Sequence, residues 1–195
     1  MTDKIESRIL VRDVRGAFLC LWHPEPFPGG KDPTPYYSGS FIMPPSHPQR
    51  GAINKLMESL ANQEWKLKGP VILKAIKATG KVFFRDGNTK PEYDGFPGNW
   101  FISARSKVQP NCFDHARNKI TEDMGIIYSG CYVNVLLSTY SYTKGNNGLG
   151  AELKGIQFLR KGDAFGGGGP PAAADEFDEI DAPDEEEMNA DEMMG

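Results

Sequence analysis

"GCYVNVLLSTYSYT" (residues 130–143) and "AELKGIQFLRK" (residues 151–161) are two long runs rich in β-branched and aromatic residues. The Asn- and Gly-rich stretch "KGNNGLG" (residues 144–150) separates them, and this arrangement predicts a β-hairpin. Similar composition predicts further strands over residues 8–22, 36–43, 71–78, 81–85 and 100–107. Many strands of short to medium length favour a small antiparallel barrel, with the OB-fold as the leading candidate.

Two features interrupt this pattern near the N-terminal side. Gly16 predicts a bulge or bend in the first strand. The prolines at 24, 26, 28, 33 and 35 predict a loop that cannot join a hydrogen-bonded ladder.

One stretch has helical rather than alternating periodicity. Ser46 or His47 can cap a helix there, and Pro48 suits its first turn. The apolar stripe of this helix consists of Ile53, Leu56, Met57, Leu60 and Ala61. The helix is expected to run to about Trp65 and to pack on the sheet. The predicted fold class is therefore mainly β: an OB-fold-like antiparallel barrel with one packing helix and a disordered acidic tail.

Charge is distributed unevenly along the chain. The chain has 22 basic and 26 acidic residues, and eleven of the acidic ones follow Pro170, where no Lys or Arg occurs. Residues 1–169 therefore hold 22 basic against 15 acidic residues, a net charge of +7. A basic body joined to an acidic tail is a pointer to nucleic-acid binding. The predicted domains are a nucleic-acid-binding body over 1–165 and a Gly/Pro hinge with a disordered acidic tail over 166–195.

Other features of the sequence limit the classes of protein to which the chain can belong. The N-terminal sequence has no apolar signal-peptide core, and no run approaches the ~18 apolar residues of a membrane span. The three cysteines argue against a disulfide framework. We therefore expect a cytoplasmic protein.

Enzymatic and metal-binding patterns are weak. Cys20 and His23, together with Cys112 and His115, offer the ligand types of a structural zinc site, but residues three apart in a strand point to opposite faces. No nucleophile elbow, Walker motif or HExxH zinc motif occurs. We expect no enzyme and no cofactor, although sequence alone leaves a metal-dependent nuclease open.

Cations instead alternate with aromatic residues along three predicted strands. In "WFISARSK" (residues 100–107), Phe101, Arg105 and Lys107 share one face. The same parity aligns Lys81, Phe83 and Arg85 in the strand before it. Near the hairpin connection, Tyr140 and Tyr142 share a face and Lys144 follows. Cations that follow phosphates and rings that stack on unpaired bases are how single strands are bound, so these nine residues form the predicted DNA-binding set.

The acidic tail complements such a surface. Its carboxylates can occupy a cationic groove until nucleic acid displaces them. Phe177 and Ile180 could anchor the tail in a partner's pocket. The alternative is a segment that only keeps the protein soluble.

The stretches "GNWFISARSK" (98–107), "YSGCYVNVLLSTYSY" (128–142) and "LKGIQFLRKGDAF" (153–165), with the tail, resemble phage-encoded single-stranded DNA-binding proteins of the OB-fold type with an acidic C-terminal tail. The resemblance implies coating of exposed strands in replication and recombination, recruitment of replication proteins through the tail, and action in the bacterial host cytoplasm. The tail departs from the best-known members, because it ends in "EMMG" and not in an aromatic residue. We therefore expect recruitment either to use "DEFDEI" (175–180) or to be weaker. The rival interpretation is an acidic-tailed adaptor that does not bind DNA. The sequence leaves a homo-oligomer possible.

Overall fold

The computed structural model of the chain describes residues 7–27 and 29–166. Phe177, Ile180 and the rest of the predicted acidic tail lie outside the described residues. Within them, the sheet consists of β1 (Ser7–Pro26), β2 (Pro35–Met43), β3 (Phe84–Asp86), β4 (Trp100–Ser106), β5 (Asn111–Phe113), β6 (Tyr132–Tyr142) and β7 (Gly148–Arg160).

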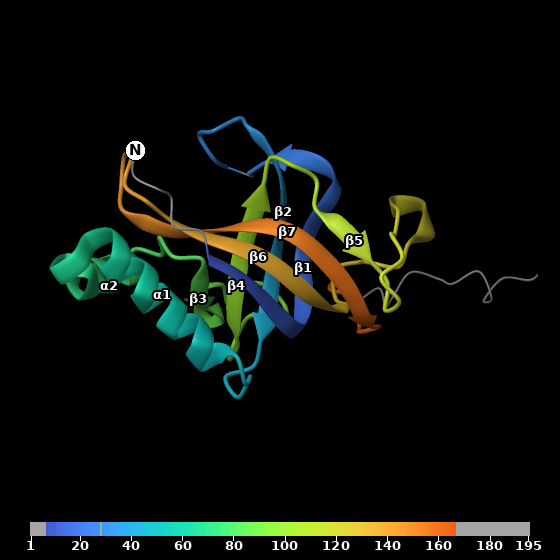
Figure 1. The fold of residues 1–195 in the computed structure, drawn as a ribbon. Coiled ribbons are helices and arrows are strands. Elements are labelled where there is room, and N and C mark those ends of the chain that lie inside the picture. Colours follow the sequence, from blue (N-terminus) through green and yellow to red (C-terminus); the bar gives the residue numbers. More distant parts are fainter. Residues whose placement is uncertain (1–6, 28, 167–195) are drawn as a thin grey trace, which may run out of the picture.

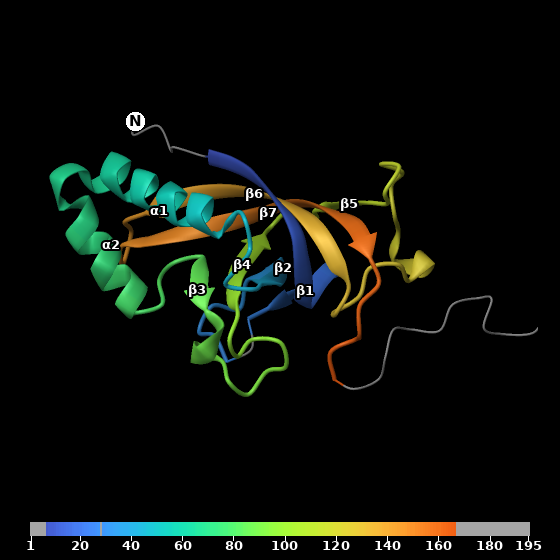
Figure 2. The ribbon, with the colours of Figure 1, turned by 90° about the horizontal axis from the view of Figure 1, so that it is seen from below.

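Five of these strands close into a barrel (Figures 1 and 2). Antiparallel pairing runs from β4 through β2, β1 and β6 to β7, and a parallel contact between Arg105 of β4 and Glu152 of β7 completes the ring. The short strands β3 and β5 attach to β4 and β7. This connectivity is that of an OB-fold, so the predicted fold class is confirmed.

Strand β1 bends twice, and it pairs with β6 on one side and with β2 on the other. Its register shifts between Val11 and Val14 against β6, and between Ala17 and Cys20 against β2. Asp13 and Phe18 have positive φ angles of 53° and 50° at these two irregularities. The bends therefore flank Gly16 and do not fall on it, since Gly16 itself pairs with Phe41.

The predicted hairpin is confirmed, and the proline-rich loop is shorter than expected. Strands β6 and β7 pair from Tyr132 opposite Arg160 to Tyr142 opposite Gly148. Pro33 lies outside the strands as expected and Pro28 lies outside the described residues, but Pro24 lies within β1. The ladder of β1 and β2 extends to Pro26 opposite Pro35, so the expectation was wrong for these two prolines as well. They lie at its last pair, where a missing N–H is tolerated.

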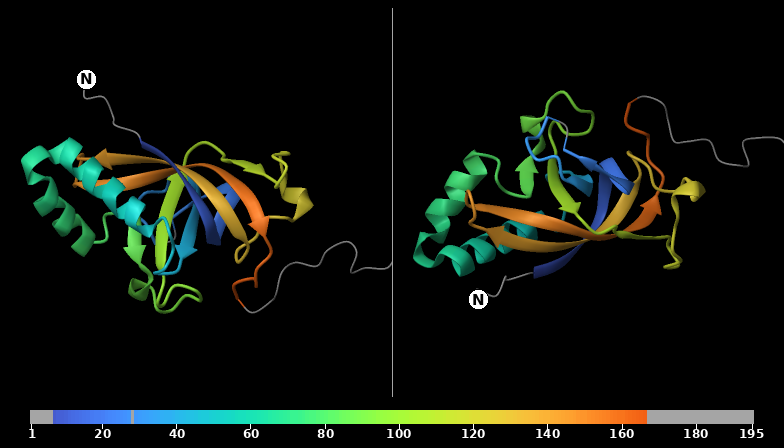
Figure 3. Two further views of the ribbon diagram at one scale, coloured as in Figure 1. Left: turned by 60° about the horizontal axis from the view of Figure 1, so that its bottom comes forward. Right: turned by 90° about the horizontal axis from the view of Figure 1, so that it is seen from above.

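Two helices, and not one, cover one end of the barrel (Figure 3). Helix α1 (Arg50–Trp65) buries Ile53, Met57, Leu60 and Ala61 of the predicted stripe. Its N-cap residue is Gln49 and no side chain caps it, so the prediction of Ser46 or His47 was wrong.

Helix α2 (Gly69–Ala78) replaces the strand predicted over 71–78. Pro70 lies in the first turn of α2, where proline is tolerated, and Leu73 and Ile76 form a buried stripe at helical spacing. The 3₁₀ turn η1 (Lys66–Lys68) joins the helices. A Cβ on Gly69 would lie 2.6 Å from Asn62 Oδ1 and 2.9 Å from the Ala61 carbonyl oxygen, so glycine permits the close approach of α2 to α1. The first helix ends at Trp65 as predicted, and the apolar run after Pro70 forms a second helix in place of the predicted strand.

Apolar side chains form two clusters. The larger cluster fills the barrel and continues under the helices. The smaller one lies against the outer surface of the barrel, where Ala17, Ile42 and Phe101 pack under Phe96 of the loop over residues 87–99, and Phe165 joins them. Among the described residues, no helix combines the length and apolar character needed to cross a membrane.

The buried thiol of Cys112 gives a test of this packing. Burial raises its pKa to about 11 from the ordinary value of 9.0. Because iodoacetamide attacks the thiolate, we expect partly exposed Cys20 to be alkylated first at pH 8, and Cys112 to react only when the protein unfolds. The raised pKa also predicts that the contribution of the neutral thiol to stability is complete below about pH 9 and is lost as the pH rises towards 11. Mass spectrometry of labelled peptides measures the order, and equal rates at Cys20 and Cys112 would contradict this packing.

Candidate nucleic-acid interface

Strands β2 and β4 present a polar outer surface. Ser38 of β2 pairs with Arg105 of β4, and Ser40 pairs with Ser103. The Arg105 guanidinium carbon lies 4.7 Å from the centroid of the Tyr36 ring, and Lys107 Nζ lies 5.9 Å from it. At this end of the surface, the exposed cations Arg105 and Lys107 thus lie against the Tyr36 ring.

Two tyrosines of β6 extend the surface over β7. Tyr140 pairs with Gly150 and Tyr142 with Gly148. A Cβ on Gly150 would lie 2.5 Å from Tyr140 Cζ, and one on Gly148 would lie 2.1 Å from Tyr142 Cζ, so each ring lies across its glycine. Burial raises the pKa of Tyr140, and the positive charge of Arg105, together with a hydrogen bond that Arg105 donates, opposes that shift. The glycines therefore make room for rings that join the cations of β4.

Arg85 lies beside these rings with little to neutralise its charge. Its guanidinium carbon is 4.9 Å from the Phe101 ring centroid, and Nη2 donates a 2.7 Å hydrogen bond to Ser103 Oγ. Its buried Nε has no hydrogen-bond partner. Burial lowers the pKa of Arg85, and the nearby Tyr142 phenol opposes this. A cation held in this way favours an anionic ligand, because a buried charge is costly unless it is paired.

The loop over residues 87–99 adds a second such cation. Lys90 Nζ lies 5.5 Å from the Tyr93 ring centroid and 5.8 Å from that of Phe101. Burial lowers the pKa of Lys90, and the like charge of Arg85 lowers it further, while Glu92 raises it. Tyr93 in turn packs edge-on against Phe18, with 4.9 Å between centroids.

Together these residues form one continuous surface, here named the cation–aromatic face. It consists of Tyr36, Arg85, Lys90, Tyr93, Arg105, Lys107, Tyr140 and Tyr142. Within residues 7–27 and 29–166, none of its cations takes part in an ion pair. Asp32 lies close enough to Arg105 and Lys107 to be affected by their charge, since its pKa is lowered mainly by Thr34 and to a lesser extent by these two cations.

Five of the nine predicted residues therefore meet on this face: Arg85, Arg105, Lys107, Tyr140 and Tyr142. Lys144 is exposed in the hairpin loop directly after Tyr142. Lys81 is half-buried where α2 leads into β3, and its carbonyl accepts a hydrogen bond from Leu149 N–H. The involvement of these seven residues in DNA binding stays a prediction.

The expectation of exposed rings was wrong at Phe83 and Phe101. Phe83 is 3% exposed because the regular strand begins only at Phe84, so the assumed alternation over 81–85 fails. Phe101 does lie on the outer side of β4 with Arg105, as its parity predicts, but Phe96 covers it and leaves it 0% exposed. Neither ring is available to stack on a base.

Sequence reasoning missed three members of the face. Tyr36 could have been found, because Tyr36, Ser38 and Ser40 alternate along β2 as Ser103 and Arg105 do along β4. Lys90 and Tyr93 lie in an irregular loop and have no periodic signal.

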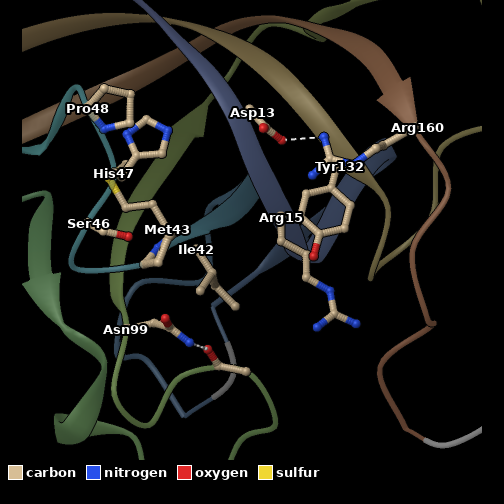
Figure 4. Close-up of a pocket in the computed structure, with 12 residues that line it drawn as sticks. Asp13, Arg15, Ile42, Met43, Ser46, His47, Pro48, Asn99, Tyr132 and Arg160 are labelled. Carbon is tan, nitrogen blue, oxygen red and sulfur yellow. Dashed lines mark hydrogen bonds and ion pairs between the residues drawn. The ribbon is translucent and has the colours of Figure 1, made fainter.

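A second basic–aromatic cluster lies around a pocket of about 440 Å³ (Figure 4). Arg15 and Arg160 flank Tyr132 there, and Arg160 pairs with Asp13. Arg15 is held by the main chain, since Nε donates to the Gly130 carbonyl and Nη2 to that of Asp163. The Arg15 guanidinium also covers the Phe165 ring at 4.1 Å. This cluster clamps the chain at residues 163–165 to the barrel.

The four candidate zinc ligands are engaged separately. The Cys20 thiol donates to the His23 carbonyl at 2.7 Å, and His23 Nε2 lies 2.9 Å from Glu122 Oε2. His115 Nε2 contacts the Leu159 carbonyl, and Cys112 is buried. In the part of the chain that the structure describes, no three His, Cys, Asp or Glu residues are grouped to hold a metal ion.

Comparison with known families places the chain among phage proteins. A family model described as the single-stranded DNA-binding protein of Enterobacter phage Enc34 matches residues 7–189. A protein designated p50 from Acyrthosiphon pisum secondary endosymbiont phage 1 is 34% identical over 186 residues, which cover 94% of this chain and 99% of that protein.

Solved structures of phage single-stranded DNA-binding proteins are also similar to this chain. The single-stranded DNA-binding protein of bacteriophage Enc34 in complex with ssDNA is 25% identical, covers 82% of this chain and 89% of its own, and superposes with a TM-score of 0.62. Its C-terminal truncation gives 26% identity, coverage of 81% and 88%, and a TM-score of 0.64. The single-stranded DNA-binding protein gp2.5 of bacteriophage T7 shares the fold at 16% identity, with coverage of 92% and 98% and a TM-score of 0.54.

Phe101 is covered and Arg105 is exposed, so substitutions at the two positions should differ in their effect on the free energy of unfolding. Phe101→Ala should lower the free energy of unfolding by about 3–5 kcal/mol, because it empties a covered site. Arg105→Ala, four residues further along the same side of β4, should change it by less than about 0.5 kcal/mol, as exposed substitutions usually do. Urea unfolding followed by fluorescence gives both values. A small loss at Phe101 would mean that the loop over 87–99 does not cover the ring in solution.

Proposed function

The chain belongs to the family of the Enterobacter phage Enc34 single-stranded DNA-binding protein, and we propose that it binds single-stranded DNA, without strong sequence preference, on the cation–aromatic face. The observation that carries this proposal is the pair Arg85 and Lys90. Both cations are partly buried against the Phe101 ring, and neither has an ion-pair partner among the described residues. Phosphate supplies the missing charge.

The rings of the face supply the second component of binding. Tyr140 and Tyr142 are supported from below by glycine positions of β7, and Tyr36 lies under Arg105 and Lys107. Stacking on such rings contributes about 1–3 kcal/mol per base and tolerates any sequence, since every base has a π-face. In OB-folds the surface of the second and third barrel strands, which are β2 and β4 here, is where oligonucleotides bind.

We extend the proposal to the acidic tail, as a competitor for the same face and as a docking segment for replication or recombination proteins. The clamp at residues 163–165 supports the first role. Phe165 packs against Gly95, where a Cβ would lie 2.7 Å from Phe165 Cε1, so the tail begins beside the loop that carries Lys90 and Tyr93. Eleven carboxylates tethered there act at high local concentration. The place of action would be the cytoplasm of a bacterial host.

Two other functions remain distinguishable from this one. An acidic-tailed adaptor predicts a body that does not bind DNA. A nuclease predicts turnover of DNA that depends on a metal ion. The proposal is of a binding protein without catalysis, and it draws support from relatives that are named for binding single strands.

Binding should fall steeply with salt. Each phosphate neutralised on a single strand adds about 0.7 to the negative slope of log affinity against log salt. Lys107→Ala should therefore weaken binding of a fluorescent oligothymidylate and reduce this slope by about 0.7, measured by anisotropy across a salt series. Tyr142→Ala should weaken binding by about 1–3 kcal/mol with the slope unchanged, because stacking releases no counterion.

Lys119→Ala is the matched control, because it removes another exposed lysine, from the segment after β5. It should leave affinity and slope close to those of the parent protein. No binding at low salt, or equal effects at Lys107 and Lys119, would contradict the proposed interface.

Deleting residues 170–195 should tighten binding at low salt and matter less as salt rises. The tail is attracted to the face over a distance set by the Debye length, about 10 Å at 0.1 M salt, which shortens as salt is added. Competition acts on association, so stopped-flow measurements should show a faster on-rate and a nearly unchanged off-rate.

A tail of the same length with Asn for Asp and Gln for Glu separates charge from length. It should behave like the deletion. Parent-like binding by this neutral tail, or weaker binding after deletion, would show that the tail does not compete for the face.

A further inference from the structure

A second basic surface lies at the corner between α1 and α2, and nothing in the proposed function uses it. We name it the α2 patch; it consists of Lys66, Leu67, Lys68, Val71 and Lys74. Leu67 is 99% exposed and Val71 is 73% exposed, the two highest values among the large apolar residues of the described chain. These aliphatic side chains lie four residues apart, with a lysine on either side of Leu67. Single exposed apolar residues are ordinary, but a pair with a charged rim marks a docking surface.

The charge of this patch is unbalanced. From residue 65 to residue 85 the chain carries six basic residues and no carboxylate. Within the described residues, no ion pair involves a lysine of the patch. Glu64, the acidic residue next to the corner, accepts a 2.7 Å hydrogen bond from Ser141 Oγ and is directed to β6. The partner that fits is therefore an acidic peptide that also carries apolar side chains.

This chain contains such a peptide. Residues 175–187, "DEFDEIDAPDEEE", hold nine carboxylates and no cation, with Phe177 and Ile180 three residues apart among them. The two apolar residues match Leu67 and Val71, and the carboxylates match the three lysines around them. We propose that the α2 patch binds the acidic segment 175–187 of a second copy of this chain.

The position of the patch favours a second copy over the same chain. In Figures 1 and 2, α2 lies at one end of the barrel, and the last described residues, which lead into the tail, lie towards the other. A contact between the end of one copy and the opposite end of the next is heterologous, and such contacts build open rows where the rotation between copies does not close a ring. An open row suits proteins that line up along a strand, but the contact itself does not rest on DNA binding.

Nucleic acid is the less suitable occupant of this surface. Its bases stack on aromatic rings, and the patch offers aliphatic side chains with no ring among its five members. Exposed Leu67 and Val71 would contribute nothing to a phosphate contact.

The test places a photo-crosslinking benzoylphenylalanine at position 67 of the full chain. Equal amounts of ¹⁴N-labelled and ¹⁵N-labelled protein are mixed and irradiated, with and without a saturating oligothymidylate, and crosslinked peptides are mapped by mass spectrometry. The label pairing separates contacts between copies from contacts within one chain. Mixed-label crosslinks from position 67 to residues 175–187, in either sample, are the expected result.

Two comparisons sharpen the outcome. The same photo-residue at Met124, which is 54% exposed and lies beside Glu122 and Asp123, should give no such crosslink. Replacing Lys68 and Lys74 by Glu should reduce the yield from position 67 by about fivefold or more, since charge reversal turns attraction into repulsion. Both lysines are exposed, and circular dichroism checks that α2 is retained.

Crosslinks to the tail of the same chain alone, to the oligonucleotide alone, or equally from positions 67 and 124 would overturn the proposal. So would the absence of tail crosslinks in both samples. Anisotropy of the oligonucleotide in the same mixture reports DNA binding separately, so failure of the proposed function is recognised independently.

Discussion

The double bend of β1 is the constraint on which the rest of the molecule depends. A single strand of 20 residues pairs with β6 through its first half and with β2 through its second. Two register shifts let it turn the corner that a closed barrel requires. The same irregularities direct functional side chains. Asp13, at the first bend, reaches Arg160, and Phe18, at the second, packs against Tyr93. Closure of the barrel and placement of the loop over 87–99 thus share one cause.

Much of the fold could be predicted from the composition and alternation of the strands. The errors occur where contact with another segment of the chain determines the secondary structure. The hairpin of β6 and β7 is visible in sequence from two β-branched and aromatic runs around an Asn- and Gly-rich connection, β2 from similar composition, and β4 from the alternation of its two faces. The run over 71–78 is apolar enough for either a strand or a helix. The choice depends on Gly69, which allows α2 to press against α1, and that contact is not visible in sequence.

The candidate site shows the same limit. Parity correctly put Phe101 and Arg105 on one side of β4, but it could not show that the loop over 87–99 covers one and leaves the other exposed. Lys90 and Tyr93 come from that covering loop, so the error at Phe101 and the omission of Lys90 and Tyr93 have one origin. A loop of irregular sequence both conceals predicted residues and contributes new ones.

The charge distribution links the two basic surfaces to one acidic segment. Phe165, one of the last described residues, packs against Gly95 in the loop that carries Lys90 and Tyr93. If the tail competes for the cation–aromatic face as proposed, tethering would give that face a higher local concentration of the tail than a neighbouring copy can supply. The α2 patch, at the other end of the barrel, would then compete less well for the tail of its own chain. In the proposed function, single-stranded DNA that fills the face would end this competition, because phosphate would displace the carboxylates. The tail would then be available to the α2 patch of the next copy, which the strand would hold close by. Binding of DNA and contact between copies would be coupled in this way without any change in the barrel itself.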